Sequence, residues 1–186
     1  MLYGRAAEQL IGERDPATNE LIIQTGNMAY SSEEFWKEAV GVVTPHRAQQ
    51  GLIVSRLQQV FGGTGVDAAL IRSAVDTVER FQGQERDVII ASYALGDPDA
   101  IEDEDEFLMS LNRFNVMASR PRVKLVVLAT REIVDHLSGD LDTLRGSRLL
   151  KTFANSYCNN SRSMTLGLII DGTRRDVSGL FGYREQ

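Results

Sequence analysis

The stretch VDTVERFQGQERDVIIAS, residues 75–92, decides how this 186-residue chain is interpreted. Its first residues, VDTV, and its last, DVIIAS, are short β-branched runs, which are typical of buried strands. Between them lies the polar segment ERFQGQER. A hairpin turn would need only about two to five residues. The longer polar segment therefore predicts a functional loop between two strands.

The same alternation continues on both sides of this stretch. Further strands are predicted at residues 39–44 and 124–130, and helices at 46–61 and from Arg131 onward. The glycine-rich residues 62–65 end the first of these helices. Strands that alternate with helices and are apolar on both faces indicate a parallel sheet in an α/β fold.

The two ends of the chain carry further patterns. Residues 20–25 suit a strand, and Ser31 with Glu34 forms a capping box at a helix start. Residues 166–183 predict a hairpin that turns at Asp171 and Gly172, as an edge addition to the sheet or as an oligomer contact. We therefore expect three parts: an N-terminal segment (1–38), the main domain (39–157) and a C-terminal extension (158–186).

The net charge of −6 is local. Residues 97–106 hold seven acidic side chains and no basic one, and removing them leaves 19 acidic against 20 basic residues. This pattern is typical of a solvated loop. Cys158 is the single cysteine, and no apolar run approaches the roughly 20 residues of a membrane span. We expect an intracellular, cytoplasmic protein without a membrane partner.

Three segments resemble known motifs, in chain order. VGVVTPHRAQQ (40–50), the opening stretch (75–92) and LNRFNVMASRPRVKLVVLAT (111–130) are similar to motifs IV, V and VI of superfamily 1 helicases, in the Upf-like and nuclease–helicase branch. The resemblance covers about half the chain. It implies the second RecA-like domain, a three-layer α/β sandwich with a mainly parallel central sheet, here with a small C-terminal β-hairpin extension.

The resemblance also implies a nucleotide site. Arg120 matches the arginine finger, Arg122 the neighbouring basic position, and Glu85 a position that reaches the nucleotide. Gly83 lets the backbone turn tightly beside them. ATP and Mg²⁺ would be held mainly by a first RecA-like domain, in the same chain or another. Arg120 and Glu85 are the residues with implied catalytic roles.

A track for single-stranded DNA or RNA is implied next to this site. Ligands of parallel sheets gather beyond the carboxyl ends of the strands, and we expect Glu85 and Arg120 to meet beyond that edge. An ion pair between Arg86 and Asp87 is expected to brace the loop. The residues implied for the track are Thr44, Pro45, His46, Arg47, Thr77 and Gln82.

Simpler interpretations stand beside these. Arg120 could be an ion-paired surface arginine, Glu85 a solvated charge and His46 a helix cap. Pro121 departs from the family pattern, which has alanine there, and a proline biases the preceding residue away from helical geometry. The finger could therefore point differently, or the site could be degenerate.

A phosphate loop needs Gly-Lys followed by Ser or Thr, whereas the lysines here follow Trp36, Val123 and Leu150. We therefore expect a fragment of an ATP-dependent helicase that hydrolyses nothing alone. The alternative is a non-catalytic helicase-like module that binds nucleic acid or protein. A small-molecule α/β enzyme is a third class, but the sequence shows neither a nucleophile elbow nor a dinucleotide fingerprint.

Overall fold

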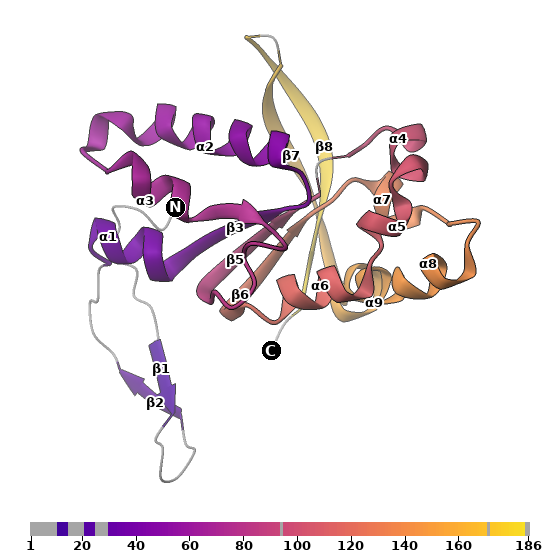
Figure 1. Ribbon diagram of the computed structural model, residues 1–186, viewed down its shortest axis with the longest axis horizontal. Coiled ribbons are helices and arrows are strands. Elements are labelled where there is room, and N and C mark those ends of the chain that lie inside the picture. The colour runs from indigo at the N-terminus through magenta and orange to yellow at the C-terminus, as the bar shows by residue number, and fades with distance from the viewer. Residues whose placement is uncertain (1–10, 15–20, 25–29, 94, 171, 185–186) are drawn as a thin grey trace.

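The computed structural model describes residues 11–14, 21–24, 30–93, 95–170 and 172–184. Its central sheet has four parallel strands in the order β4–β3–β5–β6 (Figure 1). This confirms the predicted α/β fold with a parallel sheet, and the arrangement is consistent with a RecA-like domain. The strands are β3 (Val40–Thr44), β4 (Val75–Thr77), β5 (Arg86–Ser92) and β6 (Pro121–Leu128).

Helices cover both faces of this sheet. Successive strand residues point to opposite faces, so Val43 and Ile89 join one apolar core while Val40 and Ile90 join the other. The second core takes side chains from the π-helical turn η1 (Phe35–Ala39), α2 (Arg47–Phe61) and α3 (Ala68–Ser73). The short helices α1 (Ser32–Glu34) and η2 (Gly62–Thr64) adjoin these elements in the chain. Beyond β5 the chain forms α4 (Pro98–Asp103), α5 (Asp105–Leu108), α6 (Leu111–Ala118), α7 (Arg131–Asp135), α8 (Leu141–Gly146), α9 (Arg148–Thr152) and η3 (Phe153–Tyr157).

Strand β6 is more exposed than the sequence predicts. Val123 is 74% exposed and Leu128 is 52% exposed. Although its sequence is largely apolar, this strand is therefore partly open to solvent. The reason is its place at the edge of the sheet, where it has a neighbouring strand on one side only.

The polar loop of residues 78–85 runs back along the sheet. Strand β4 ends at Thr77, level with the last residue of β3, whereas β5 begins at the opposite end of its neighbours. The loop must therefore cover the length of the sheet, and its Phe81 is fully buried on the way. Gly41 makes room for it, since a Cβ atom there would lie 2.6 Å from the Phe81 ring.

Both ends of the chain form antiparallel pairs. Strands β1 (Ile11–Arg14) and β2 (Leu21–Gln24) pair with each other, and the second confirms the predicted N-terminal strand, although Glu20 and Thr25 lie outside the described residues. The capping box of Ser31 and Glu34 is confirmed. Strands β7 (Asn160–Ile170) and β8 (Thr173–Tyr183) form a separate two-stranded sheet, so the hairpin is not an edge addition. Gly172 has φ +75°, as the tight turn requires, and Asp171 lies outside the described residues.

We predict that Gly41→Ala destabilises the fold by about 1–3 kcal/mol, as overpacking of a core does. The added methyl group would press on Phe81 at 2.6 Å and on Ile89 at 2.9 Å. Urea unfolding followed by circular dichroism measures the change. Gly51→Ala is the matched control, because its Cβ meets nothing within 4 Å in the middle of α2 and should stabilise by about 0.5–1 kcal/mol. If Gly41→Ala and the wild type unfold at the same urea concentration, the prediction that Phe81 packs closely against Gly41 is contradicted.

Candidate functional site

The segments that carry Glu85 and Arg120 lie side by side. The N–H of Arg86 donates to the carbonyl of Arg120 at 3.2 Å, so the residues that precede β5 and β6 are neighbours. Their edge differs from the prediction, however. Both residues stand at the amino ends of the parallel strands, not beyond the carboxyl ends. The loop reaches that edge because it returns across the sheet before β5 begins.

Glu85 and Arg120 differ in their surroundings. Glu85 is exposed and Arg120 is half-buried. The Nε atom of Arg120 is buried and has no hydrogen-bond partner among the described residues. A buried donor without a partner costs free energy, so an anion that reaches this edge would satisfy it. The residues present therefore fit one wall of a phosphate site.

Arg120 lies in the short link between a helix and a strand, not in the helix itself. Helix α6 ends at Ala118, and β6 begins at Pro121. Arg113 lies in α6 and Arg120 does not, so the two arginines do not share a helix face. Gly83 has φ +84°, which confirms the predicted tight turn.

Arg122 is a bracket between three elements. Its Nε donates to Asp87 at 2.8 Å, and its guanidinium also donates to the carboxylate and the carbonyl of Glu38, both at 3.0 Å. Partial burial lowers the pKa of Arg122, but these hydrogen bonds outweigh it and hold the pKa above its ordinary value. The bracket ties β6 to β5 and η1.

The expected ion pair between Arg86 and Asp87 was wrong. Asp87 instead accepts from Arg122 and from the hydroxyl of Tyr30. Arg86 donates to the Gln84 side chain at 3.1 Å and to the Glu85 carbonyl at 2.8 Å. The loop is thus braced by its own backbone and amide groups, and Arg86 is largely buried.

At the carboxyl edge, half of the predicted strand-binding residues are buried. Thr44 is fully buried and its hydroxyl donates to Gln49. Thr77 is 5% exposed, and Pro45 is also buried. The prediction that these side chains face a nucleic-acid strand is therefore corrected, because packing against the sheet occupies them. His46, Arg47 and Gln82 remain accessible.

His46 connects this edge to the acidic segment. It occupies the N-cap position of α2 without a side-chain capping bond. Its Nε2 lies 3.3 Å from the Glu104 carboxylate, and its ring stacks on Phe107 with centroids 5.7 Å apart. Arg113 covers the same Phe107 ring at 3.8 Å and donates to Glu79 at 2.8 Å. The sequence indicated none of these contacts.

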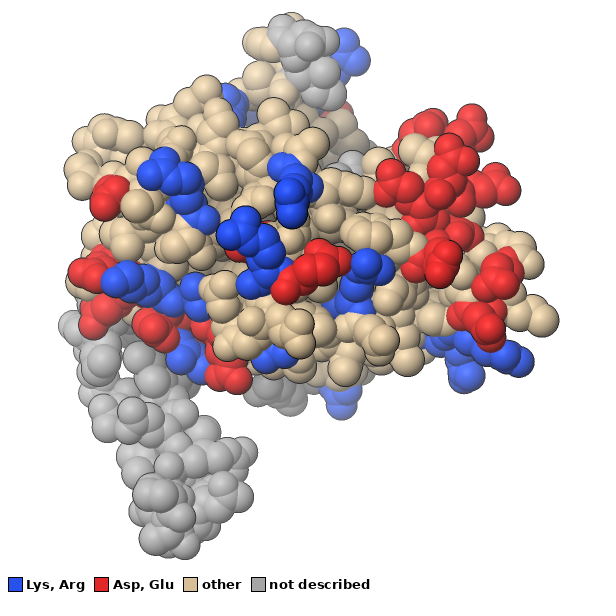
Figure 2. All heavy atoms as spheres, in the orientation of Figure 1, with Lys and Arg blue, Asp and Glu red and all other residues tan. Residues whose placement is uncertain are grey.

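The acidic residues 97–106 form α4 and α5 rather than a loop. Figure 2 shows their carboxylates as one cluster over these helices, apart from the basic side chains between α2 and α6. The carboxylate of Asp105 also lies 3.2 Å from the Nε2 atom of His136. Burial raises the pKa of Asp105, but hydrogen bonds from Ser138 and His136 lower it below its ordinary value. One end of this face is therefore strongly acidic, whereas basic and acidic side chains are mixed over the rest of it (Figure 2).

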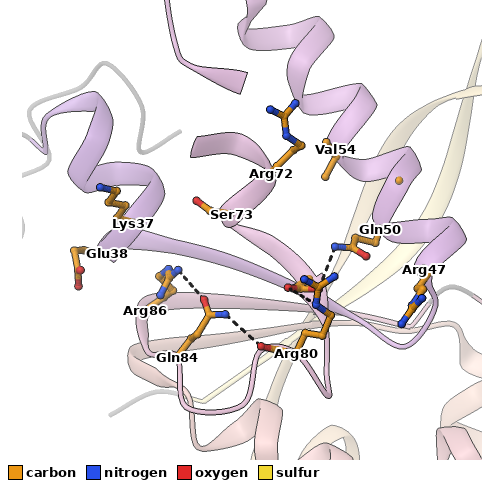
Figure 3. Close-up of a pocket in the computed structure, with 12 residues that line it drawn as sticks. Lys37, Glu38, Arg47, Gln50, Val54, Arg72, Ser73, Arg80, Gln84 and Arg86 are labelled. Carbon is orange, nitrogen blue, oxygen red and sulfur yellow. Dashed lines mark hydrogen bonds and ion pairs between the residues drawn. The ribbon is translucent and has the colours of Figure 1, made fainter. Parts of the chain in front are cut away.

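A hollow of about 910 Å³ lies along the β4 edge of the sheet (Figure 3). Of the predicted site residues, only Arg47 lines it. The signals that sequence analysis could have used are Arg80, inside the polar loop, and Arg72, just before β4. The lining residues are Lys37, Glu38, Arg47, Gln50, Gly51, Val54, Arg72, Ser73, Asp76, Arg80, Gln84 and Arg86.

The described residues show neither a membrane-spanning helix nor a metal-binding cluster. Within the ranges that the structure describes, no helix has the length and apolar character to cross a membrane. Among the same residues, no group of three or more His, Cys, Asp and Glu side chains is arranged to hold a metal ion.

Comparison with known proteins gives both a family and named relatives. Residues 18–132, more than half of the chain, match a family model described as an AAA domain. RNA helicase Mov10l1 of Homo sapiens is 38% identical over 98 residues, which are 51% of this chain and 7% of that protein. DNA polymerase alpha-associated DNA helicase A of Saccharomyces cerevisiae is 34% identical over 125 residues, 67% of this chain and 16% of that protein.

A third relative, probable helicase senataxin of Mus musculus, is 33% identical over 89 residues, 48% of this chain and 3% of that protein. The chain thus spans less than a fifth of the length of each relative. The AAA domain match, the parallel sheet and the helicase relatives agree with the motifs. The chain therefore belongs to this AAA domain family and is a superfamily 1 helicase domain of the Upf-like branch.

Proposed function

We propose that this chain is the second motor domain of an ATP-dependent helicase and supplies Arg120 as the arginine finger. The observation that carries the proposal is the adjacency of Glu85 and Arg120 at one edge of the sheet, where the Nε of Arg120 is buried without a partner. ATP would be bound by a first RecA-like domain that faces this edge. The limits of the main domain, residues 39–157, remain a prediction from the sequence.

The two residues would contact different parts of the nucleotide. A guanidinium beside the γ-phosphate stabilises the negative charge that develops there during phosphoryl transfer. The Arg120 side chain would supply that charge, and the exposed Glu85 carboxylate can accept hydrogen bonds from ribose hydroxyls. Mg²⁺ held by the first domain would neutralise the β- and γ-phosphate oxygens.

Single-stranded DNA or RNA would bind at the carboxyl edge, next to His46 and Arg47. Helix α2 begins there, and the backbone amides of a helix start are suitable phosphate ligands. The loop of residues 78–85 spans the sheet between this edge and the nucleotide edge. It would therefore link strand binding to the position of Glu85.

A second candidate is a helicase-like module that binds nucleic acid without catalysis. It is favoured by Pro121 and by Arg122, whose guanidinium is bonded to Asp87 and Glu38. A module of this kind would bind strands but would leave ATP hydrolysis unaffected by changes at Arg120.

In the protein that joins this chain to its first RecA-like domain, Arg120→Ala should lower nucleic-acid-stimulated ATP hydrolysis by roughly 10³- to 10⁵-fold, as loss of an arginine finger does. A steady-state assay of phosphate release measures the rate. Thermal unfolding should change little, because the Nε of Arg120 makes no hydrogen bond among the described residues.

Arg122→Ala is the control for this experiment. It removes the bonds to Asp87 and Glu38 and should lower the unfolding temperature. The rate of ATP hydrolysis by this variant should fall only in proportion to the fraction of the protein that is folded. An unchanged hydrolysis rate in Arg120→Ala would reject the catalytic role and favour the non-catalytic module.

Glu85→Gln should raise the KM for ATP by about tenfold or more, since a hydrogen bond to a charged group contributes about 1.5–3 kcal/mol. Glu85 is exposed, so the unfolding temperature should stay that of the wild type. A titration of the rate with ATP separates KM from kcat. An unaltered KM would remove Glu85 from the nucleotide site.

A further inference from the structure

We propose that the hollow along the β4 edge binds phosphate groups of the nucleic-acid strand through Arg47, Arg72 and Arg80. The inference rests on the proposed function, because it assumes that the chain binds a strand. It adds to the track Arg72, which lies outside the three motif segments, and Arg80, which lies within the second segment but has no role implied by the resemblance.

The charge of the hollow is opposite to that of the chain. Five cationic side chains and two carboxylates line it, whereas the whole chain has a net charge of −6. Positive side chains attract a phosphodiester backbone whatever its sequence, because they release the counterions that surround it. A local excess of three positive charges in an acidic protein indicates a polyanionic ligand.

Three of these arginines are available for a ligand. Within the described chain, Arg47 and Arg72 have neither a hydrogen bond nor an ion pair, and both are exposed. Arg80 contacts Asp76 at 3.7 Å, and its side chain is 67% exposed. An exposed pair of that length contributes only about 0–1 kcal/mol. The guanidinium of Arg80 can therefore turn toward a phosphate at little cost.

The other polar groups of the hollow are already engaged. The amide of Gln50 donates to the Val75 carbonyl at 3.0 Å and to Asp76 at 3.1 Å. Figure 3 shows this contact on one side of the hollow and the bond between Gln84 and Arg86 on the other. The carboxylate of Asp76, in β4, thus accepts hydrogen bonds from Gln50 and from the N–H of Thr77. Its charge repels a phosphate less than a free carboxylate would.

The lining also favours a strand backbone over a free nucleotide. Small-molecule pockets are lined mainly by apolar and aromatic side chains. Here the lining has no aromatic residue, and Val54 is its single branched apolar side chain. A base would find no ring to stack on, whereas phosphates would find arginines. The hollow also starts at Arg47, next to His46 in the predicted track, so the strand would continue without a break.

The test uses the 186-residue chain and a fluorescent single-stranded oligonucleotide, with anisotropy titrations at several salt concentrations. In the double variant Arg72→Gln and Arg80→Gln, the slope of log K against log salt should become less steep by about 0.7 for each arginine. Arg72→Lys with Arg80→Lys should keep the wild-type slope, because the charge is retained.

Arg131→Gln with Arg145→Gln is the matched control. These arginines are 62% and 73% exposed and lie in α7 and α8, away from the hollow. Among the described residues, their ion pairs are with Asp135 and Asp142 of their own helices. The control removes the same charge and should leave the slope unchanged. Thermal unfolding of each variant checks that the fold is retained.

Four outcomes would overturn the inference. Strand binding with the wild-type slope in the double glutamine variant excludes the hollow while leaving the proposed function intact. An equal loss of slope in the Arg131→Gln and Arg145→Gln control shows that oligonucleotide binding depends only on the net charge of the chain. Failure of the wild-type chain to bind the oligonucleotide at low salt overturns both the strand function and this inference. If ATP displaces the oligonucleotide from the wild-type chain but not from the double glutamine variant, the hollow is a nucleotide site instead.

Discussion

The crossing of residues 78–85 is the constraint on which the rest of the structure depends. A strand of three residues, β4, ends at the carboxyl edge, and the next strand starts at the amino edge. The chain must return between them, and burial of Phe81 beneath Gly41 fixes its path. That anchor brings Glu85 beside Arg120. Without it, the polar residues of the loop would belong to one edge of the sheet only.

The Arg122 bracket completes what the crossing begins. Arg122 is the second residue of β6, two positions after Arg120. Its guanidinium donates hydrogen bonds to Asp87 in β5 and to Glu38 in η1. The start of β6 is therefore held from two sides. A side chain that the family resemblance assigned to the nucleotide is thus engaged within the fold. Its three hydrogen bonds involve a charged guanidinium, and such bonds contribute more to stability than an exposed ion pair alone does.

Local sequence patterns predicted the helices and strands, but not the contacts between residues that lie far apart in the sequence. The β-branched run at Val40–Thr44 and the capping box at Ser31 depend on near neighbours in sequence, and both are confirmed. The partnership of Arg122 with Glu38 joins residues 84 positions apart, which periodicity cannot show. The edge at which Glu85 lies follows from its place directly before β5, because the connection between parallel strands must return to the amino edge before the next strand begins. The hollow required α2 and α3 to face the polar loop, which only the tertiary fold determines.

Net charge is a poor guide to the partners of this chain, because its charges are separated in space. The carboxylates of residues 97–106 gather over α4 and α5, while five cationic side chains line the hollow beside β4. Screening at physiological salt limits the reach of a surface charge to about 8 Å, so each region acts on what lies close to it. The two regions meet at His46, which contacts Glu104 at the start of α2. A strand bound along the arginines would therefore encounter repulsion from the acidic helices on one side only, and this asymmetry favours a path along β4 over one across α4.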